Sequence, residues 1–384
     1  MRFLHTSDWH LGRLFHGVHL TEDQAYILAQ FNELVCDSKP DAIIIAGDIY
    51  DRAVPPIEAV ELLNELVCKI LLECKVPIIM IAGNHDSAER LGFGSRLLSG
   101  QGLYVAGPLT KEIVPVTLYD KYGPVYFAPF TYAEPALVRE RLSCSAVGNH
   151  EQAMQAMIQQ VSRKIPNGAR SVAIAHAFIA GSMESESERP LSVGGSSMVN
   201  SSVFQPFSYT ALGHLHNSQQ AGNQTVRYSG SLLKYSFDEA QQQKGINMVE
   251  IDQHGNVTVE KISLSPRRDV RCIKGYFNQI LQQPIEAKSR QDYLLVTLLD
   301  SEPILDAMGK LREIYPNVLQ IESPRFSKTG VLSGLATDHR KLSEKELFAA
   351  FFTQMTGESM TAEQQEQLAT VIEDLYRQER EAIL

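Results

Sequence analysis

Short apolar segments recur along the first 264 residues of the chain. Residues 42–46 (AIIIA), 77–82 (PIIMIA) and 172–175 (VAIA) consist almost wholly of apolar side chains. Runs of this length and composition are typical of strands that helices cover on both faces. They constrain the fold strongly, because parallel strands need crossover connections, which are usually helical.

The segments between these runs have the period of amphipathic helices. Residues 21–35 and 55–71 each carry apolar side chains at helical spacing, and Thr21 with Gln24 fits a capping box at the start of the first helix. Later strands are predicted at 209–212, 225–228, 247–251 and 257–264. The whole pattern predicts an α/β fold built as a two-sheet sandwich flanked by helices.

Five of the predicted strands run directly into Asp, Asn or His. The motifs are D-x-H at 8–10, GD-x-x-D at 47–51, GNHD at 83–86, a lone His176 and GH-x-H at 213–216. Ligand sites in α/β sheets gather beyond the carboxyl ends of the strands. Each motif alone has an ordinary explanation, such as a turn, a helix cap or a buried histidine. Their combination at five strand ends predicts a functional site.

The residue types in these motifs indicate divalent metal ions. Imidazole suits transition metals and carboxylate suits Mg²⁺ or Mn²⁺, so a mixture fits Mn²⁺ or Fe²⁺ better than a structural zinc site. The set is too large for one ion and suits two ions that share a carboxylate. Two ions about 3.5–4 Å apart are able to clamp a phosphate and to generate hydroxide at neutral pH.

The order of the motifs resembles that of the calcineurin-like metallophosphoesterases. Longer segments resemble one branch of that family, the Mre-type nucleases. These segments are HTSDWHLG at 5–12, AGDIYDRAVPP at 46–56, AGNHDS at 82–87, ALGHLH at 211–216 and YSGSLLKYSFDE at 228–239. The resemblance implies a metallophosphoesterase nuclease domain over residues 1–264.

The resemblance also implies a set of metal ligands for two Mn²⁺ ions, with Mg²⁺ or Fe²⁺ as other candidates. One ion would be held by Asp8, His10, Asp48 and His216. The other would be held by Asp48, Asn84, His176 and His214, so that Asp48 bridges the two.

Two further residues are implied to be catalytic. His85 would lie over the scissile phosphate and protonate the leaving oxygen or stabilise its charge. Asp51 would hold His85 in the working tautomer. Archaeal and eukaryotic relatives carry His at the position of Asp51. Asp86, next to His85, is expected to be structural and to cap the following helix.

The remainder of the chain changes in charge. Residues 265–340 contain 11 Lys and Arg and 9 Asp and Glu, whereas residues 341–384 contain 4 and 9. The resemblance implies a smaller α+β domain at 265–340 that caps DNA, and a helical tail at 341–384 that binds a Rad-like ATPase. Candidate phosphate contacts are Arg267, Arg268, Arg271, Lys274, Arg325 and Lys328. The alternatives are a solvated charged surface and tail helices that pack on their own chain.

Helices at 55–74 and 87–98 resemble those that pair two nuclease subunits, which implies a homodimer. The alternative is that the apolar faces of these helices pack into the core of their own chain.

The implied activity is 3′–5′ exonuclease on double-stranded DNA ends and endonuclease on single strands or hairpins, in DNA repair, replication and recombination. Two rival functions remain: hydrolysis of small phosphoesters on the same scaffold, and a non-catalytic scaffold.

Composition limits the kind of nucleic-acid-binding surface and the cellular compartment that we expect for this protein. The net charge of −10 excludes a basic footprint over the whole chain, so any nucleic-acid site must be local or shared with a partner. The number of cysteines is five and no two form C-x-x-C, which predicts reduced thiols. We expect a cytoplasmic, nucleoid-associated bacterial protein, because the sequence contains neither a secretory signal nor an apolar run long enough to span a membrane.

Overall fold

The structure, a computed structural model, describes residues 1–188, 191, 197–302, 304–323 and 358–381, together with the pairs 345–346, 348–349 and 352–353. The chain divides into two compact units, Met1–Arg271 and Cys272–Leu384. The first unit contains all five strand-end motifs.

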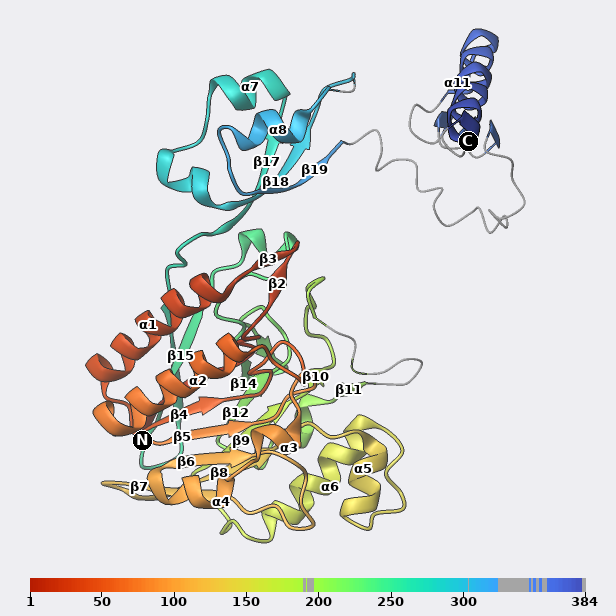
Figure 1. Ribbon diagram of the computed structural model, residues 1–384. Helices are drawn as coiled ribbons and strands as arrows, with labels where there is room; N and C mark the ends of the chain where they lie inside the picture. The colour runs from red at the N-terminus through yellow and green to blue at the C-terminus, as the bar shows by residue number, and fades with distance from the viewer. Residues whose placement is uncertain are drawn as a thin grey trace. The chain divides into compact units, whose positions relative to one another are not determined.

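Two six-stranded sheets form the first unit (Figure 1). The first sheet has the order β16-β15-β1-β4-β5-β6. Its strands are β1 (Arg2–Thr6), β4 (Ala42–Ile45), β5 (Ile78–Ile81), β6 (Leu103–Ala106), β15 (Gly245–Ile251) and β16 (Val257–Ser263). The pairs β1–β4, β4–β5 and β5–β6 are parallel, whereas β15 runs antiparallel to β1. The carboxyl ends of β1, β4 and β5 therefore meet at one edge of the sheet.

The second sheet has the order β13-β14-β12-β9-β8-β7. Its strands are β7 (Val116–Asp120), β8 (Gly123–Phe130), β9 (Ser171–His176), β12 (Tyr209–Gly213), β13 (Gln220–Ala221) and β14 (Asn223–Tyr228). Because β8, β9, β12 and β14 run in parallel, the carboxyl ends of β9 and β12 also lie together. Two short pairs accompany the sheets, β2 (Leu14–Phe15) with β3 (Val18–His19) and β10 (Phe178–Ile179) with β11 (Met198–Val199).

The two sheets pack face to face through a buried apolar layer. Phe3 and Ile79 of the first sheet belong to the same core cluster as Phe127, Ile174 and Tyr209 of the second. Phe3 meets Phe127 edge to face, with ring centroids 5.6 Å apart. The predicted two-sheet sandwich is thereby confirmed.

Helices cover the outer faces of the sandwich, as the apolar strands required. They are α1 (Thr21–Ser38), α2 (Ile57–Lys69), α3 (Ala88–Leu91), α4 (Ser95–Leu98), α5 (Pro135–Arg141) and α6 (His150–Ser162). Figure 1 shows α1 and α2 in front of the first sheet. Met154 and Val161 of α6 pack with Val138 of α5 onto Phe130 and Ala173 of the second sheet.

The predicted capping box at the start of α1 is wrong. The residue before the helix is Leu20, and no side chain caps it. The side-chain amide of Gln24 instead donates to the backbone oxygen of His10 at 2.8 Å and accepts from the backbone nitrogen of Gly12 at 3.0 Å. Gln24 is buried, and it serves the D-x-H loop because that loop carries backbone groups that need partners inside the protein.

The expectation that all cysteines are reduced is also wrong. Cys36 in α1 and Cys74 in the π-helical turn Ile70–Cys74, which continues α2, form a disulfide with a Cα–Cα distance of 5.3 Å. The two residues are 38 positions apart, so only the packing of the two helices brings them together. Cys68, Cys144 and Cys272 are free thiols.

The second unit contains a three-stranded sheet in the order β17-β18-β19. Its elements are β17 (Val270–Gly275), which begins at the end of the first unit, α7 (Phe277–Gln282), β18 (Tyr293–Leu298), α8 (Ala307–Arg312), β19 (Val318–Glu322) and α11 (Ala362–Glu381). Phe277 and Leu311 from the helices and Val296 and Val318 from the strands share its core. Among the residues that the structure describes, no helix has both the length and the apolar composition that crossing a membrane requires.

Candidate metal centre

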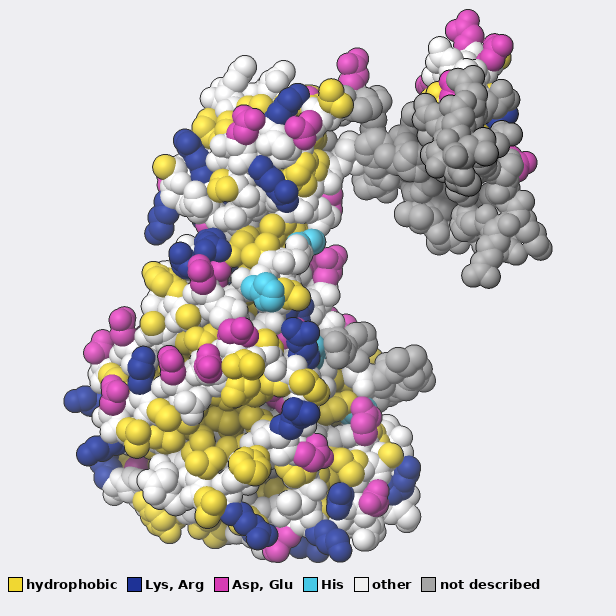
Figure 2. All heavy atoms as spheres, in the orientation of Figure 1, with side chains coloured by type: hydrophobic (Ala, Val, Ile, Leu, Met, Phe, Trp, Pro, Cys, Tyr) yellow, Lys and Arg dark blue, Asp and Glu magenta, His cyan; other side chains and the backbone are white. Residues whose placement is uncertain are grey.

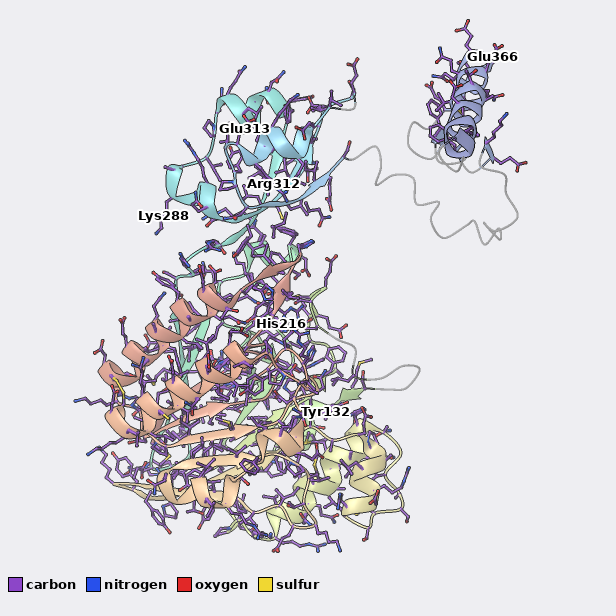
Figure 3. The ribbon with its side chains drawn as sticks, in the orientation of Figure 1. Tyr132, His216, Lys288, Arg312, Glu313 and Glu366 are labelled. Carbon is purple, nitrogen blue, oxygen red and sulfur yellow. A yellow bond between two sulfur atoms is a disulfide. The ribbon has the colours of Figure 1, made fainter. Side chains whose placement is uncertain are left out.

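The five strand ends bring the predicted ligands to one place. Asp8 and His10 follow β1, Asp48 follows β4, Asn84 follows β5, His176 ends β9, and His214 and His216 follow β12. All of these except Asn84 are at most 3% exposed. Figure 3 labels His216 and also Tyr132, whose ring centroid lies 6.4 Å from that of His176.

The backbone at this centre adopts rare conformations. Nine non-glycine residues of the described chain have positive φ, and four of them are Asp8, His10, Asp48 and His214. Such residues cost energy and cluster at functional sites. Gly83 allows the close approach that the site needs, since a Cβ there would lie 2.2 Å from Asp48 Oδ1.

Asp48 lies at the middle of the cluster. Its Oδ2 is 3.7 Å from His10 Nε2 and 3.5 Å from His176 Nε2. Its Oδ1 accepts a hydrogen bond of 2.9 Å from the backbone nitrogen of His85. One oxygen of Asp48 therefore faces imidazoles of both predicted ion positions, while the other is fixed by the main chain.

The possible ligand atoms form groups that are close enough together to share a metal ion. The ligand atoms of Asp8, His10 and His216 lie within 4.8 Å of one another, and so do those of Asp8, Asp48 and His176. His10 Nε2 and His216 Nε2 are 3.0 Å apart. Two nitrogens bound to one ion at about 2.1 Å lie roughly 3–3.5 Å apart, so this pair fits a shared ion.

Hydrogen bonding fixes the tautomer of His176, which belongs to the group with Asp8 and Asp48. Its Nδ1 donates to the backbone oxygen of Ala46 at 2.9 Å, and its Nε2 lies 2.8 Å from Asn84 Oδ1. With Nδ1 occupied in this way, Nε2 is the nitrogen left to bind a metal ion, and it lies next to the amide oxygen of Asn84. The ring of His214 lies beside that of His176, at a centroid distance of 5.4 Å.

Burial and mutual attraction set the charges of the metal-free centre. Burial raises the pKa of the Asp8 carboxyl to about 6. For His176, burial favours the neutral ring, but the carboxylates of Asp48 and Asp8 outweigh it and raise the pKa to about 9. Burial, together with the charge of His176, lowers the pKa of His214 well below its ordinary value. A metal ion held by His176 would therefore have to displace a proton from that ring.

His85 lies beside these donors, with Nε2 3.9 Å from Asp48 Oδ2, and it forms a third group of possible metal donors with His10 and Asp51. We expected the carboxylate of Asp51 to orient this ring. The contact is made instead by the backbone oxygen of Asp51, which accepts from His85 Nδ1 at 2.7 Å. The carboxylate lies 2.9 Å from Arg13 Nη1 and 3.6 Å from His10 Nδ1. Its proximity to two basic groups outweighs burial and lowers the pKa of Asp51 to about 2.

Asp86 is structural, but it does not cap the helix that follows. Ser87 caps α3, by accepting from the backbone nitrogen of Arg90. The carboxylate of Asp86 accepts instead from the backbone nitrogens of Ile49, Tyr50 and Gly83 at 2.9–3.2 Å. It thereby ties the GD-x-x-D loop to the GNHD loop.

Several residues that contact the site were not predicted from the sequence. Arg13 contacts Asp51 and lies over the ring of Tyr235. The one sequence feature that could have indicated it is its position three residues after His10. Glu239 contacts His216 and ends the YSGSLLKYSFDE segment, which carries the family resemblance but no metal-binding motif. Ser187 contacts His216 as well, from a loop that carries no motif.

Comparison with known proteins identifies the family of the chain. A family model described as calcineurin-like phosphoesterase matches residues 1–217, and one described as type 5 capsule protein repressor C-terminal domain, SbcD_C, matches residues 266–356. The SbcD subunit of the nuclease SbcCD from Staphylococcus epidermidis is 34% identical over 368 residues, which are 96% of this chain and 97% of the relative.

The chain belongs to the SbcD family of calcineurin-like phosphoesterases. The Staphylococcus saprophyticus member is also 34% identical, over 97% of this chain and 98% of its own. A dimetal phosphatase from Danio rerio is similar in structure with a TM-score of 0.41 and 12% identity, over 69% of this chain and 97% of its own. Membership makes the chain a metal-dependent phosphoesterase, as the strand-end motifs predicted.

Proposed function

We propose that this SbcD-family chain is a Mn²⁺-dependent phosphodiesterase that cleaves DNA. The observation that carries the proposal is the position of Asp48 Oδ2, 3.7 Å from His10 Nε2 and 3.5 Å from His176 Nε2. A carboxylate oxygen between two sets of buried donors suits a pair of ions. Relatives whose names make them part of the nuclease SbcCD support DNA as the substrate.

The proposed ligand sets are those that the family resemblance implies, and they share Asp48. Asp8, His10, Asp48 and His216 would hold one ion, and Asp48, Asn84, His176 and His214 the other. The mixture of imidazole, carboxylate and amide donors favours Mn²⁺ or Fe²⁺, with Mg²⁺ less suited to so many nitrogens. Two such ions, when bound, supply an activated water and the positive charge that phosphodiester hydrolysis needs.

His85 is the proposed proton donor to the leaving oxygen. Its Nδ1 donates to the backbone oxygen of Asp51 at 2.7 Å, which leaves Nε2 to exchange the proton that chemistry requires. The Asp51 carbonyl also stabilises the protonated ring. The carboxylate of Asp51 would orient Arg13 and His10 at the same edge of the site.

The substrates proposed are double-stranded ends, cleaved by 3′–5′ exonuclease activity, and single strands or hairpins, cleaved endonucleolytically, in DNA repair, replication and recombination. Residues 265–340 would cap the DNA. Of the candidate phosphate contacts, Arg267 and Arg268 already pair with Glu22, at 2.5 and 3.2 Å. Lys274 is exposed, which makes it a better candidate. Arg325 and Lys328 lie outside the described residues.

The tail at 341–384 would bind a Rad-like ATPase of the SbcC type. In α11, Val371 is 56% exposed, which is consistent with an apolar contact to a partner. A homodimer would form through the helices at 55–74 and 87–98. Figure 2 shows hydrophobic side chains gathered over α2, and Val60, Phe93 and Leu97 are 44%, 86% and 83% exposed.

The test is an assay on end-labelled linear duplex and on p-nitrophenyl phosphate. The chain is freed of metal with EDTA and reconstituted with Mn²⁺, and it is tested with and without its ATPase. We expect Mn²⁺-dependent shortening of the labelled strand, which Asp48→Asn abolishes. Hydrolysis of the small ester alone would favour a small-molecule phosphoesterase, and inactivity toward both substrates with metal bound would favour a scaffold.

A further inference from the structure

A buried carboxylate stands behind one of the candidate metal ligands. Glu239, in the 3-10 turn Asp238–Gln241, is completely buried. Its Oε1 lies 3.3 Å from His216 Nδ1, on the side of the ring opposite to Nε2. The candidate ligand atom of His216 is Nε2, which faces His10.

A serine hydroxyl bridges the carboxylate and the imidazole. Ser187 Oγ lies 2.6 Å from His216 Nδ1 and also donates to Glu239 Oε1. A hydroxyl has one proton to give, so when it donates to Glu239 it accepts from His216. The chain of donors therefore runs from His216 Nδ1–H to Ser187 Oγ–H to the carboxylate, which fixes the proton on Nδ1 and leaves Nε2 with a free electron pair.

Lys244 completes the arrangement from the other side. Its ammonium donates to Glu239 Oε2 at 2.6 Å and to the backbone oxygen of His216 at 2.7 Å. It also donates to Ser231 Oγ at 2.9 Å. The pair of Glu239 and Lys244 thus holds both the ring and the backbone of His216. Lys244 is 7% exposed, so the pair is almost completely removed from water.

Stability alone does not account for such a pair. Removing two charges from water costs about as much as their attraction returns, so apolar residues of the same volume often stabilise a core equally well. A carboxylate that receives the outer N–H of a metal-bound imidazole has a known physical effect: it fixes the tautomer and raises the basicity of the ligand nitrogen.

We propose that Glu239, acting through Ser187 and balanced by Lys244, is a positioning residue that fixes His216 as the Nδ1–H tautomer and raises the metal affinity of the His216 site. This inference deepens the proposed function, and it rests on that function only in taking His216 as a metal ligand.

The test measures metal binding and the tautomer rather than DNA cleavage. Wild type, Glu239→Gln and the double variant Glu239→Gln/Lys244→Met are compared; the double variant removes both charges of the pair. Mn²⁺ affinity is measured by calorimetry on the metal-free full chain. The His216 tautomer is read from ¹H–¹⁵N spectra of protein labelled at histidine, with His216→Ala for assignment. Melting temperature is recorded for each variant.

The matched control is Asp120→Asn. Asp120 forms a similarly buried ion pair with Arg170, with a distance of 2.7 Å and side chains 8% and 7% exposed. Arg170 precedes β9 (Ser171–His176), so this pair lies at the opposite end of that strand from His176, roughly 17 Å away at 3.3 Å per residue. The control should melt earlier and bind Mn²⁺ as wild type does.

We expect Glu239→Gln to weaken one Mn²⁺ site by about 10–100-fold, to leave the other site intact and to populate the Nε2–H form of His216. The double variant should regain melting temperature but not affinity. Affinity that is unchanged in Glu239→Gln, or that returns together with stability in the double variant, would overturn the inference and leave Glu239 a structural residue. Failure of wild type to cleave DNA, with the metal results as expected, would count against the nuclease proposal alone.

Discussion

The ring of His85 donates to the backbone oxygen of Asp51 at 2.7 Å, while the carboxylate of Asp51 lies 2.9 Å from Arg13. The main chain of the GD-x-x-D loop therefore orients the histidine of the GNHD loop. A substitution that removes the Asp51 side chain leaves this hydrogen bond in place, so the roles of His85 and Asp51 can be separated by mutation.

His85→Ala should keep both ions and lose most cleavage. The proposal makes His85 a general acid rather than a metal ligand, and loss of a general acid typically costs about 10²–10⁴-fold in rate. Metal content is measured in the purified variant beside the rate on end-labelled duplex. A halved metal content would place His85 among the ligands.

Asp51→Ala should cost much less in rate than His85→Ala, because the variant retains the carbonyl that holds His85. What it loses is the contact of the carboxylate with Arg13, a hydrogen bond between charged groups of the kind that contributes about 1.5–3 kcal/mol to stability. Arg13→Met, which removes the other side of that contact, is the matched variant and should have a similar rate. A loss as large as that of His85→Ala would show that the carboxylate takes part in the chemistry.

Metal affinity should rise with pH up to about pH 9. The pKa of His176 is raised to about 9 in the metal-free centre. Below that pH the ion must displace a proton from His176, and this displacement costs less free energy as the pH rises, so the metal affinity increases. Calorimetry in buffers of different ionisation enthalpy at pH 7.5 should detect proton release on Mn²⁺ binding. Affinity that does not change between pH 6.5 and 9 would contradict the shift at His176.

Breaking the bond between Cys36 and Cys74 should destabilise the first unit. Closing a loop of 38 residues is worth about 4 kcal/mol in the free energy of unfolding by the chain-entropy model. Cys36→Ser is compared with Cys68→Ser, which alters a free exposed thiol and should melt as wild type does. Thiol titration of the unreduced, denatured protein should find three thiols, and five would refute the bond.

Deletion of residues 341–384 should leave a folded, metal-binding chain that no longer co-purifies with its ATPase. The reason is that the core of the second unit is formed by Phe277, Val296, Leu311 and Val318, all before the tail. Mn²⁺ affinity and melting temperature are measured beside the co-purification. An insoluble or early-melting truncation would mean that the tail packs on its own chain.

The sequence by itself determined the layers of the fold and the position of the site. The apolar runs at 42–46 and 172–175 had to be buried on both faces, and the polar residues that follow them had to emerge at strand ends. Local signals failed where a side chain served a distant backbone. Gln24 matched a capping box but binds the D-x-H loop, and Asp86 preceded a helix but binds the GD-x-x-D loop.

Only the tertiary structure decided which groups meet across the two sheets. His10 and His216 are separated by 206 residues, yet their Nε2 atoms are 3.0 Å apart. The disulfide of Cys36 with Cys74 and the contact of Glu239 with His216 likewise depend on packing. Periodicity reports which face of an element is buried, but it contains no information about the partner that covers that face. The geometry of the centre therefore came from the packing of the two sheets rather than from the order of the motifs.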